Sequence, residues 1–334
     1  MKVKILDLYI IKKFLGTFLF AIGLIVCIAV VFDISEKVDD FIERHAPLKA
    51  IAFDYYLNFI PYFANLFSPL FVFISVIFFT SKMAGQTEII AILNSGISFN
   101  RFLRPYIISA TVIAIASFYL NNWVIPHANL VRLQFENIYI KNPYVYRGRN
   151  IHRQIKPGEF VYFESYDNKA NTGFMFSLEK FEEGKLVTKL MADRITWDSL
   201  TQKWSIENYT IRHINGMTEE LKKGIRLDTA LSIHPSEFNR RMNFIEAMDF
   251  SELNTYIKEE KQRGSEVIPF YEVEKYRRTS YPFATFILTL IGVAISSKKV
   301  RGGVGLQLGA GILLSFTYIM FMQVSTTFAT NGNL

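Results

Sequence analysis

The side chains that most often carry chemistry are few and widely separated in this sequence of 334 residues. No two histidines have a spacing such as H-x-x-x-H, which would place two imidazoles on one helix face, so a metal site is not predicted. The histidines are His45, His127, His152, His213 and His234. The single cysteine, Cys27, has no partner in the chain for a disulfide or a multi-thiolate site.

Nucleotide chemistry is not indicated either. The phosphate-binding pattern G-x-x-x-x-G-K-[ST] does not occur, so ATP-driven work would require another polypeptide. A glycine-rich run begins at Gly302 and opens an apolar stretch. Phosphate binding is one interpretation of this run, but Gly305 and Gly309 have the small-x-x-x-small spacing that lets helices pack closely, and we favour packing.

Five long uncharged stretches dominate the rest of the sequence. They cover 14–32, 55–81, 105–126, 279–297 and 302 to the end of the chain. About 20 apolar residues cross the roughly 30 Å hydrocarbon core of a bilayer as a helix, so each stretch is long enough to span a membrane. We therefore predict an α-helical membrane bundle with five spans, and an enzyme built within the spans is disfavoured because they contain no cluster of ionisable residues.

The short loops indicate the orientation. Basic residues precede the first span and occupy the loops between spans two and three and between spans four and five, including Lys2, Lys82 and Arg301. The positive-inside rule makes this side cytoplasmic, together with the N-terminus. The acidic loop 33–49 and the large insert then face outward. The formal charge of +7 resides mainly in the cytoplasmic flanks, so it does not indicate nucleic acid binding.

The insert between the third and fourth spans has the pattern of a β domain. Strands are predicted at 159–165, 173–181, 185–197, 203–214 and 226–233, because these segments are rich in β-branched and aromatic residues and are separated by turn residues. This pattern favours a sandwich or jelly roll. A capped helix is predicted at 249–263. The predicted domains are 1–126 for spans one to three, 127–269 for the β domain and 270–334 for the remaining spans.

A short amphipathic helix is predicted at 86–95, on the cytoplasmic side. Thr87 is a candidate N-cap, Glu88 lies near the positive helix end, and Gly96 is a stop signal. Such a helix is what an ABC permease presents to its ATPase. The alternative is an interfacial helix that rests on lipid, with Glu88 simply solvated. The spacing alone does not decide between them.

Three segments resemble the lipopolysaccharide-export permeases of the LptF/LptG family. They are KILDLYIIKKFL at 4–15, EIIAILNSGIS at 88–98 and YRRTSYP at 276–282, and the resemblance extends over nearly the whole chain. It implies a multi-pass protein of the bacterial inner membrane with a periplasmic jelly-roll domain. Members have six spans, so the sixth is missing here, and either the sequence is truncated or the protein lacks that helix.

The resemblance also implies partners. They are a cytoplasmic ABC ATPase dimer that binds ATP and Mg, a second permease subunit, periplasmic transfer proteins, and lipopolysaccharide itself as the substrate. This chain would bind no cofactor. Glu88 matches the acidic residue of the family's coupling helix, and we expect Ile89, Ile92 and Leu93 to provide its apolar contact surface and Gly96 to end it.

The resemblance places the lipid gate at the first and fifth spans. Lys37 and Arg44 lie just outside the first span and are candidates for binding lipid phosphates at the rim, although pairing with Glu36, Asp40 and Glu43 is an alternative. A second basic run without acids includes Arg147, Arg149 and Arg153, which either steer phosphates or form a solvated face.

Aromatic residues of the predicted strands either line an acyl slide or form the core. They are Phe160, Tyr162, Phe174, Phe176, Trp197 and Trp204. For the whole protein, the alternative to a transport subunit is a membrane-anchored periplasmic scaffold that binds partners and transports nothing.

Overall fold

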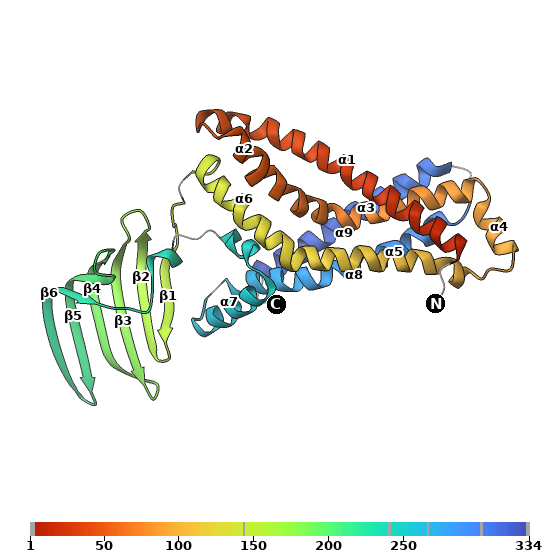
Figure 1. Cartoon of the computed structure of the whole chain (residues 1–334). Coiled ribbons are helices and arrows are strands. Elements are labelled where there is room, and N and C mark those ends of the chain that lie inside the picture. Colours follow the sequence, from red (N-terminus) through yellow and green to blue (C-terminus); the bar gives the residue numbers. More distant parts are fainter. Residues whose placement is uncertain (1–3, 143, 239–241, 266, 301–302, 332–334) are drawn as a thin grey trace. The chain divides into compact units, whose positions relative to one another are not determined.

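The computed structural model describes residues 4–142, 144–238, 242–265, 267–300 and 303–331. The predictions that concern Lys2, Arg301, Gly302 and residues 332–334 lie outside this part of the chain. The molecule divides into two compact units (Figure 1). The helical unit consists of Met1–Ile140, Ile245–Leu253 and Pro269–Leu334, and the β unit consists of Lys141–Phe244 and Asn254–Ile268.

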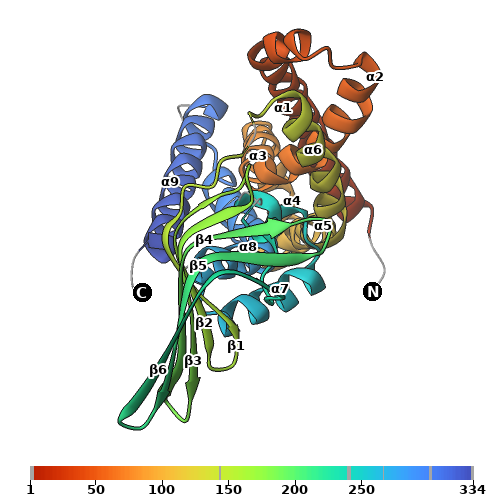
Figure 2. The same cartoon turned by 90° about the vertical axis from the view of Figure 1, so that its left-hand side faces the viewer.

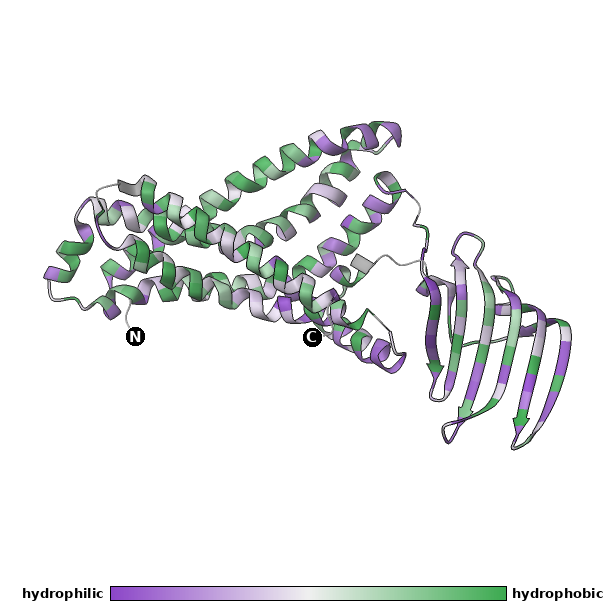
Figure 3. Ribbon diagram, turned by 180° about the vertical axis from the view of Figure 1, so that it is seen from behind, coloured by the Kyte–Doolittle hydropathy of each residue, from purple (hydrophilic) through white to green (hydrophobic). Residues whose placement is uncertain are grey.

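The helical unit contains the five predicted spans, and the first four are longer than their apolar stretches. The first is α1 (Ile5–Glu43) and the second runs through α2 (Leu48–Ala50), η1 (Ile51–Tyr56) and α3 (Leu57–Gly85). The third is α5 (Phe99–Tyr119), η2 (Leu120–Val124) and α6 (Ile125–Tyr139), and the last two are α8 (Ile268–Ser296) and α9 (Gly303–Asn331). All five are long and apolar enough to cross a membrane, and Figure 3 shows their predominantly hydrophobic residues.

Prolines explain where the second and third spans leave regular α-helical geometry. A proline lacks the N–H that an α-helix needs, and its ring clashes with the carbonyl four residues earlier. Pro126 lies two residues after the end of the π-helical η2, and Pro61 lies five residues after the end of the π-helical η1. A π turn shifts the hydrogen-bond register there, so both spans continue as unbroken helices.

The short helix α4 (Glu88–Asn94) lies at one end of the helical unit, which we name the α4 end, and α2 lies at the other, the α2 end (Figure 1). Near the α4 end, aromatic rings hold three spans together. The ring of Phe79 stacks on those of Phe14 and Tyr106, with centroid distances of 5.8 and 5.3 Å. All three rings are almost completely buried, so α1, α3 and α5 share one core.

The β unit is built on a six-stranded antiparallel sheet. Its strands are β1 (Arg149–Lys156), β2 (Glu159–Asp167), β3 (Thr172–Glu182), β4 (Lys185–Asp198), β5 (Lys203–Asn215) and β6 (Thr218–Thr229). Every strand pairs with its neighbours in sequence, in the order β1-β2-β3-β4-β5-β6 (Figure 2). The predicted combination of a helical membrane part and an inserted β domain is therefore confirmed.

Two details of the predicted strands were wrong. β1 was not predicted, and the last strand runs from Thr218 to Thr229 instead of 226–233. Both strands form the edges of the sheet, and most of their side chains are exposed or partly exposed. Edge strands of this kind lack the apolar alternation that identifies a half-buried strand, and backbone pairing with a neighbour specifies them instead.

The chain after β6 covers one face of the sheet. Ile233 and Phe238 are buried there with Phe163, Phe176 and Trp204 of the strands, and a short η3 (Pro235–Glu237) lies between them. The indole N–H of Trp204 donates to the carbonyl oxygen of Ile233 at 2.9 Å. The chain then passes through η4 (Met242–Ala247) to α7 (Phe250–Gln262), close to the helix predicted at 249–263.

Candidate functional site

The short helix α4 forms where the sequence predicted one, between the second and third spans. Gly96 follows it with φ +84°, a conformation that favours glycine, and its N–H donates to the carbonyl of Leu93 at 3.1 Å. Thr87 occupies the predicted N-cap position, but its side chain accepts no hydrogen bond from the helix. Its hydroxyl instead donates to the carbonyl oxygen of Gln86 at 2.6 Å.

The apolar residues of α4 divide between two faces. Ile89 is 2 % exposed and belongs to the core shared by α1, α3 and α5, and Ile92 and Leu93 pack against that core. Ile90 is 50 % exposed, and Ala91 and Asn94 are exposed with it. A seven-residue helix has little stability of its own, so the inner face fixes α4 to the bundle and the outer face is presented outward.

Polar contacts with α1 and α5 surround the start of α4. The hydroxyl of Tyr9 donates to Oε2 of Glu88 at 3.0 Å. The guanidinium of Arg101 donates to both carboxylate oxygens of Asp7 at 2.6 and 2.7 Å, and Asp7 is 4 % exposed. A bidentate pair of this kind fixes distance and orientation together. The start of α1 is therefore locked to the start of α5 beside α4.

Lys37 has a partner that the sequence analysis did not name. At the α2 end, its ammonium donates to Oδ1 of Asp33 and to the hydroxyl of Tyr55. The hydroxyl of Tyr56 donates to the other oxygen of Asp33 at 3.1 Å. Asp33 lies one turn before Lys37, and α1 continues through both residues, so the two side chains meet on one face of the helix. Arg44 is half-buried at the C-terminus of α1.

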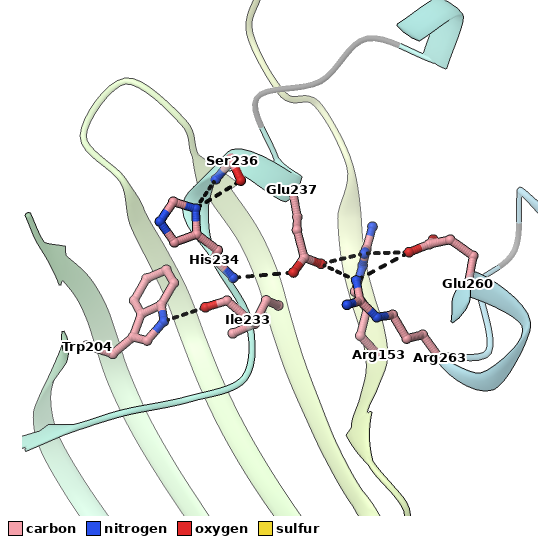
Figure 4. A network of polar contacts seen from close by, with 8 residues as sticks. All are labelled: Arg153, Trp204, Ile233, His234, Ser236, Glu237, Glu260 and Arg263. Atoms are coloured by element: carbon pink, nitrogen blue, oxygen red, sulfur yellow. Dashed lines mark hydrogen bonds and ion pairs between the residues drawn. The ribbon is translucent and has the colours of Figure 1, made fainter. Parts of the chain in front are cut away.

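The basic residues of the β unit have different surroundings. Arg147 and Arg149 are exposed. Arg153 instead donates to Glu237 at 3.1 Å and lies 3.8 Å from Glu260, a buried carboxylate of α7 (Figure 4). Arg263 bonds the same two carboxylates. Arg153 therefore takes part in a network that joins β1, η3 and α7.

The aromatic candidates of the strands are also divided. Trp204 and Phe176 are buried in the core of the β unit. Phe160 and Phe174 are about two fifths exposed, at 39 and 41 %. Tyr162 and Trp197 are partly exposed. These four rings, unlike Trp204 and Phe176, have surface that a ligand could reach without repacking of the core.

Close packing in α9 occurs at a glycine that the sequence analysis did not select. Among the described residues, no atom lies within 4 Å of where a Cβ would stand on Gly305 or Gly309. A Cβ on Gly311 would collide with the side chain of Ile77 in α3. Packing at Gly305 and Gly309 would therefore involve atoms beyond this part of the chain.

A cluster of buried and partly buried charges was missed altogether. It comprises Arg132 and Glu136 of α6, Glu246 of η4, and Glu274, Arg277 and Arg278 of α8. The sequence did contain a signal for this cluster, namely Glu274 four residues before Arg278. Such a pair at the edge of an apolar span is seldom merely solvated.

Part of this charge cluster borders a cavity of about 50 Å³ in the helical unit. Asn129 and Asn121 also line it, and the side-chain oxygen of Asn129 and nitrogen of Asn121 are buried without a partner among the described residues. A cavity of this size and polarity can hold ordered water. Burial, reinforced by the nearby carboxylate of Glu274, raises the pKa of Glu246, while Arg132 and Arg277 oppose the rise.

Within the described residues, no group of three or more His, Cys, Asp or Glu side chains could hold a metal. What the structure presents is an apolar helical bundle with a rigid exposed element at one end and an inserted β domain.

Such an architecture is that of a multi-pass membrane protein with an inserted β domain. The family model of the lipopolysaccharide export system permease LptF/LptG matches residues 8–334, which is essentially the whole chain. The chain belongs to this family. Comparison with curated proteins finds no match.

Proposed function

We propose that the chain is a permease subunit of an ATP-driven transporter that extracts lipopolysaccharide from the bacterial inner membrane and passes it to a periplasmic bridge. Membership of the family supports the substrate and the permease role. A dimeric ABC ATPase would bind ATP and Mg at the cytoplasmic face, and a second permease subunit would complete the membrane part. This chain itself would bind no cofactor.

The observation that carries the proposal is the arrangement of α4. This helix is fixed to the bundle by Ile89, Ile92 and Leu93, and it presents Ile90 and the partly exposed Glu88. A rigid outward element transmits a push from a partner into the core of three spans. In this proposal Glu88 and Ile90 contact the ATPase, whereas the three inner residues, first expected at that contact, transmit the movement.

The orientation follows from the charged loops. With the N-terminus and α4 in the cytoplasm, the β unit is periplasmic. Lys37 and Arg44 then lie near the outer end of α1, where lipid phosphates are found. Asp33 holds the ammonium of Lys37 in place. In this proposal a lipid phosphate replaces Asp33 as the partner of that ammonium. Arg147 and Arg149 are the exposed bases of the β unit that would meet phosphate next.

The test is affinity purification from the native membrane, comparing the wild type with Glu88→Ala. We expect an ATPase and a second permease to accompany the wild type, and the variant to lose the ATPase or to hydrolyse ATP without releasing lipid. Glu183→Ala is the matched control, because this exposed carboxylate lies in the turn between β3 and β4. If no ATPase accompanies any of the three proteins, the transporter is refuted and the anchored scaffold remains.

A further inference from the structure

The chain returns to the helical unit in the middle of the β unit. Ile245–Leu253 belongs to the helical unit, although Lys141–Phe244 before it and Asn254–Ile268 after it belong to the β unit. Ile245 is completely buried. The contacts of this short return hold it to the spans of the helical unit.

Arg278 of α8 makes two of these contacts. Its Nη1 donates to the carbonyl oxygen of Met248 at 2.6 Å and its Nη2 donates to that of Ile245 at 2.9 Å. Its Nε donates to Oε1 of Glu274, one turn earlier, at 2.9 Å. The side chain is 4 % exposed. The planar guanidinium therefore binds two main-chain carbonyls and a carboxylate at once.

The third span holds the same segment from another direction. The side-chain amide of Asn129 donates to the carbonyl oxygen of Glu246 at 3.2 Å. Arg132 lies 3.6 Å from the carboxylate of Glu246 and 3.7 Å from that of Glu136. Asn129 and Arg132 both belong to α6, the helix that leads into the β unit.

Buried contacts of this type are not easily exchanged. A guanidinium that loses its acceptors in a buried site remains unpaired, and so do the carbonyls, so the broken state is strongly disfavoured. The bonds to main-chain carbonyls also hold the backbone itself, whatever the side chains of the segment do. Segment 245–248 is therefore fastened to α6 and α8 as one body.

We propose that this set of contacts is a clamp that transmits movement of the spans to the β unit, with Arg278 as its central positioning residue. A displacement of α8 or α6 would carry segment 245–248 with it, and the segment continues covalently into the β unit on both sides. This inference rests on the proposed transport function, because transmission has a purpose only if the spans move during a cycle.

The test replaces the clamp by a reversible covalent link. Arg278→Gln removes the charge and the forked geometry, and it is combined with Asn129→Cys and Glu246→Cys in a Cys27→Ser background. The two positions are close, because the side-chain amide of Asn129 donates to the main-chain oxygen of Glu246 at 3.2 Å, and the length of the linker covers the separation of the two new side chains. A short bifunctional methanethiosulfonate joins them, and dithiothreitol releases them. Lipid release and ATP hydrolysis are measured on the complex purified from its membrane.

We expect Arg278→Gln to slow lipid release about tenfold or more while ATP hydrolysis persists, as the loss of several charge-assisted bonds implies. The crosslink should restore release to within about threefold of the equally crosslinked parent that retains Arg278, and dithiothreitol should abolish the rescue. Arg278→Lys should recover only part of the rate, because one ammonium cannot bond all three acceptors in the same geometry.

Two results would overturn the clamp. One is normal release by Arg278→Gln, and the other is efficient crosslinking without any rescue, which would mean that Arg278 acts elsewhere. Failure of the proposed function looks different: the unmodified wild-type complex would then release no lipid on ATP addition. Hydrogen exchange at 245–248 supplies a readout independent of transport, and unchanged exchange in Arg278→Gln would also refute the clamp.

Discussion

Two adjacent isoleucines of α4 allow a direct test of how this helix is held. Ile89 is 2 % exposed in the core shared by α1, α3 and α5, whereas Ile90 is 50 % exposed. Replacing a buried isoleucine by alanine typically costs about 2–5 kcal/mol, since apolar contacts are lost and a cavity remains. Replacing a half-exposed isoleucine costs about 1 kcal/mol or less, because only part of its apolar surface is buried against the protein.

The cost at Ile89 should appear as local opening. A helix of seven residues is unstable without its packing, so α4 should detach before the bundle unfolds. A loss of about 3 kcal/mol raises the population of the open state by roughly 150-fold. Ile89→Ala should therefore accelerate amide hydrogen exchange in 88–94 by about two orders of magnitude, while Ile90→Ala accelerates it by about fivefold at most.

The assay is hydrogen exchange with mass spectrometry on the chain in lipid nanodiscs. Peptides from α1 and α3 serve as internal references for the stability of the bundle. Equal acceleration by the two variants would refute the assignment of inner and outer faces. Unchanged exchange in Ile89→Ala would show that packing of this side chain does not hold α4.

Three further predictions concern stability. Gly311→Leu should lower the thermal unfolding temperature in detergent, because its Cβ would collide with Ile77, whereas Gly309→Leu should change it little; equal effects would contradict the packing described for α9. Trp204→Phe removes the bond to the Ile233 carbonyl and should reduce the free energy of unfolding of the β unit by about 1–3 kcal/mol, measured by urea titration with near-ultraviolet circular dichroism. Because the pKa of Glu246 in the folded protein is raised above its unfolded value of 4.5, this carboxyl group contributes its full stabilisation below pH 4.5. That contribution is lost as the pH rises through the folded pKa. Thermal melts from pH 4 to 9 should thus show a weaker decline with pH for Glu246→Gln than for the wild type, and parallel curves would refute the assignment.

The membrane spans were predictable because a long apolar stretch leaves few alternatives. Their ends were not. Residues 33–43 are largely polar, so hydropathy ends the first span at Phe32, yet α1 continues to Glu43. Asp33 and Lys37 lie one turn apart there and satisfy each other beside Tyr55. A polar sequence can remain helical where its charges pair along one face.

The contacts of the candidate sites depended on tertiary structure. The stop at Gly96 is encoded locally, and it was predicted correctly. Which isoleucine of α4 faces inward is decided by the angle at which the helix meets the bundle. Likewise, the bonds from Arg278 to Ile245 and Met248 join segments that are about 30 residues apart, and the acceptors are main-chain carbonyls. Every residue has a main-chain carbonyl, so the residue types at these positions do not indicate which carbonyl accepts a bond.

The length of α1 has a mechanical consequence. Its 39 residues contain no proline, unlike α3, α5 and α8, so it forms a rod of roughly 58 Å, about twice the thickness of the hydrocarbon core. Asp7 and Tyr9 anchor one end and Asp33 and Lys37 anchor the other. If such a rod pivots at its α4 end, a tilt of about 5° displaces the opposite end by roughly 5 Å, a distance comparable to one helical turn. The first span can thus act as a lever that joins the two faces of the bilayer.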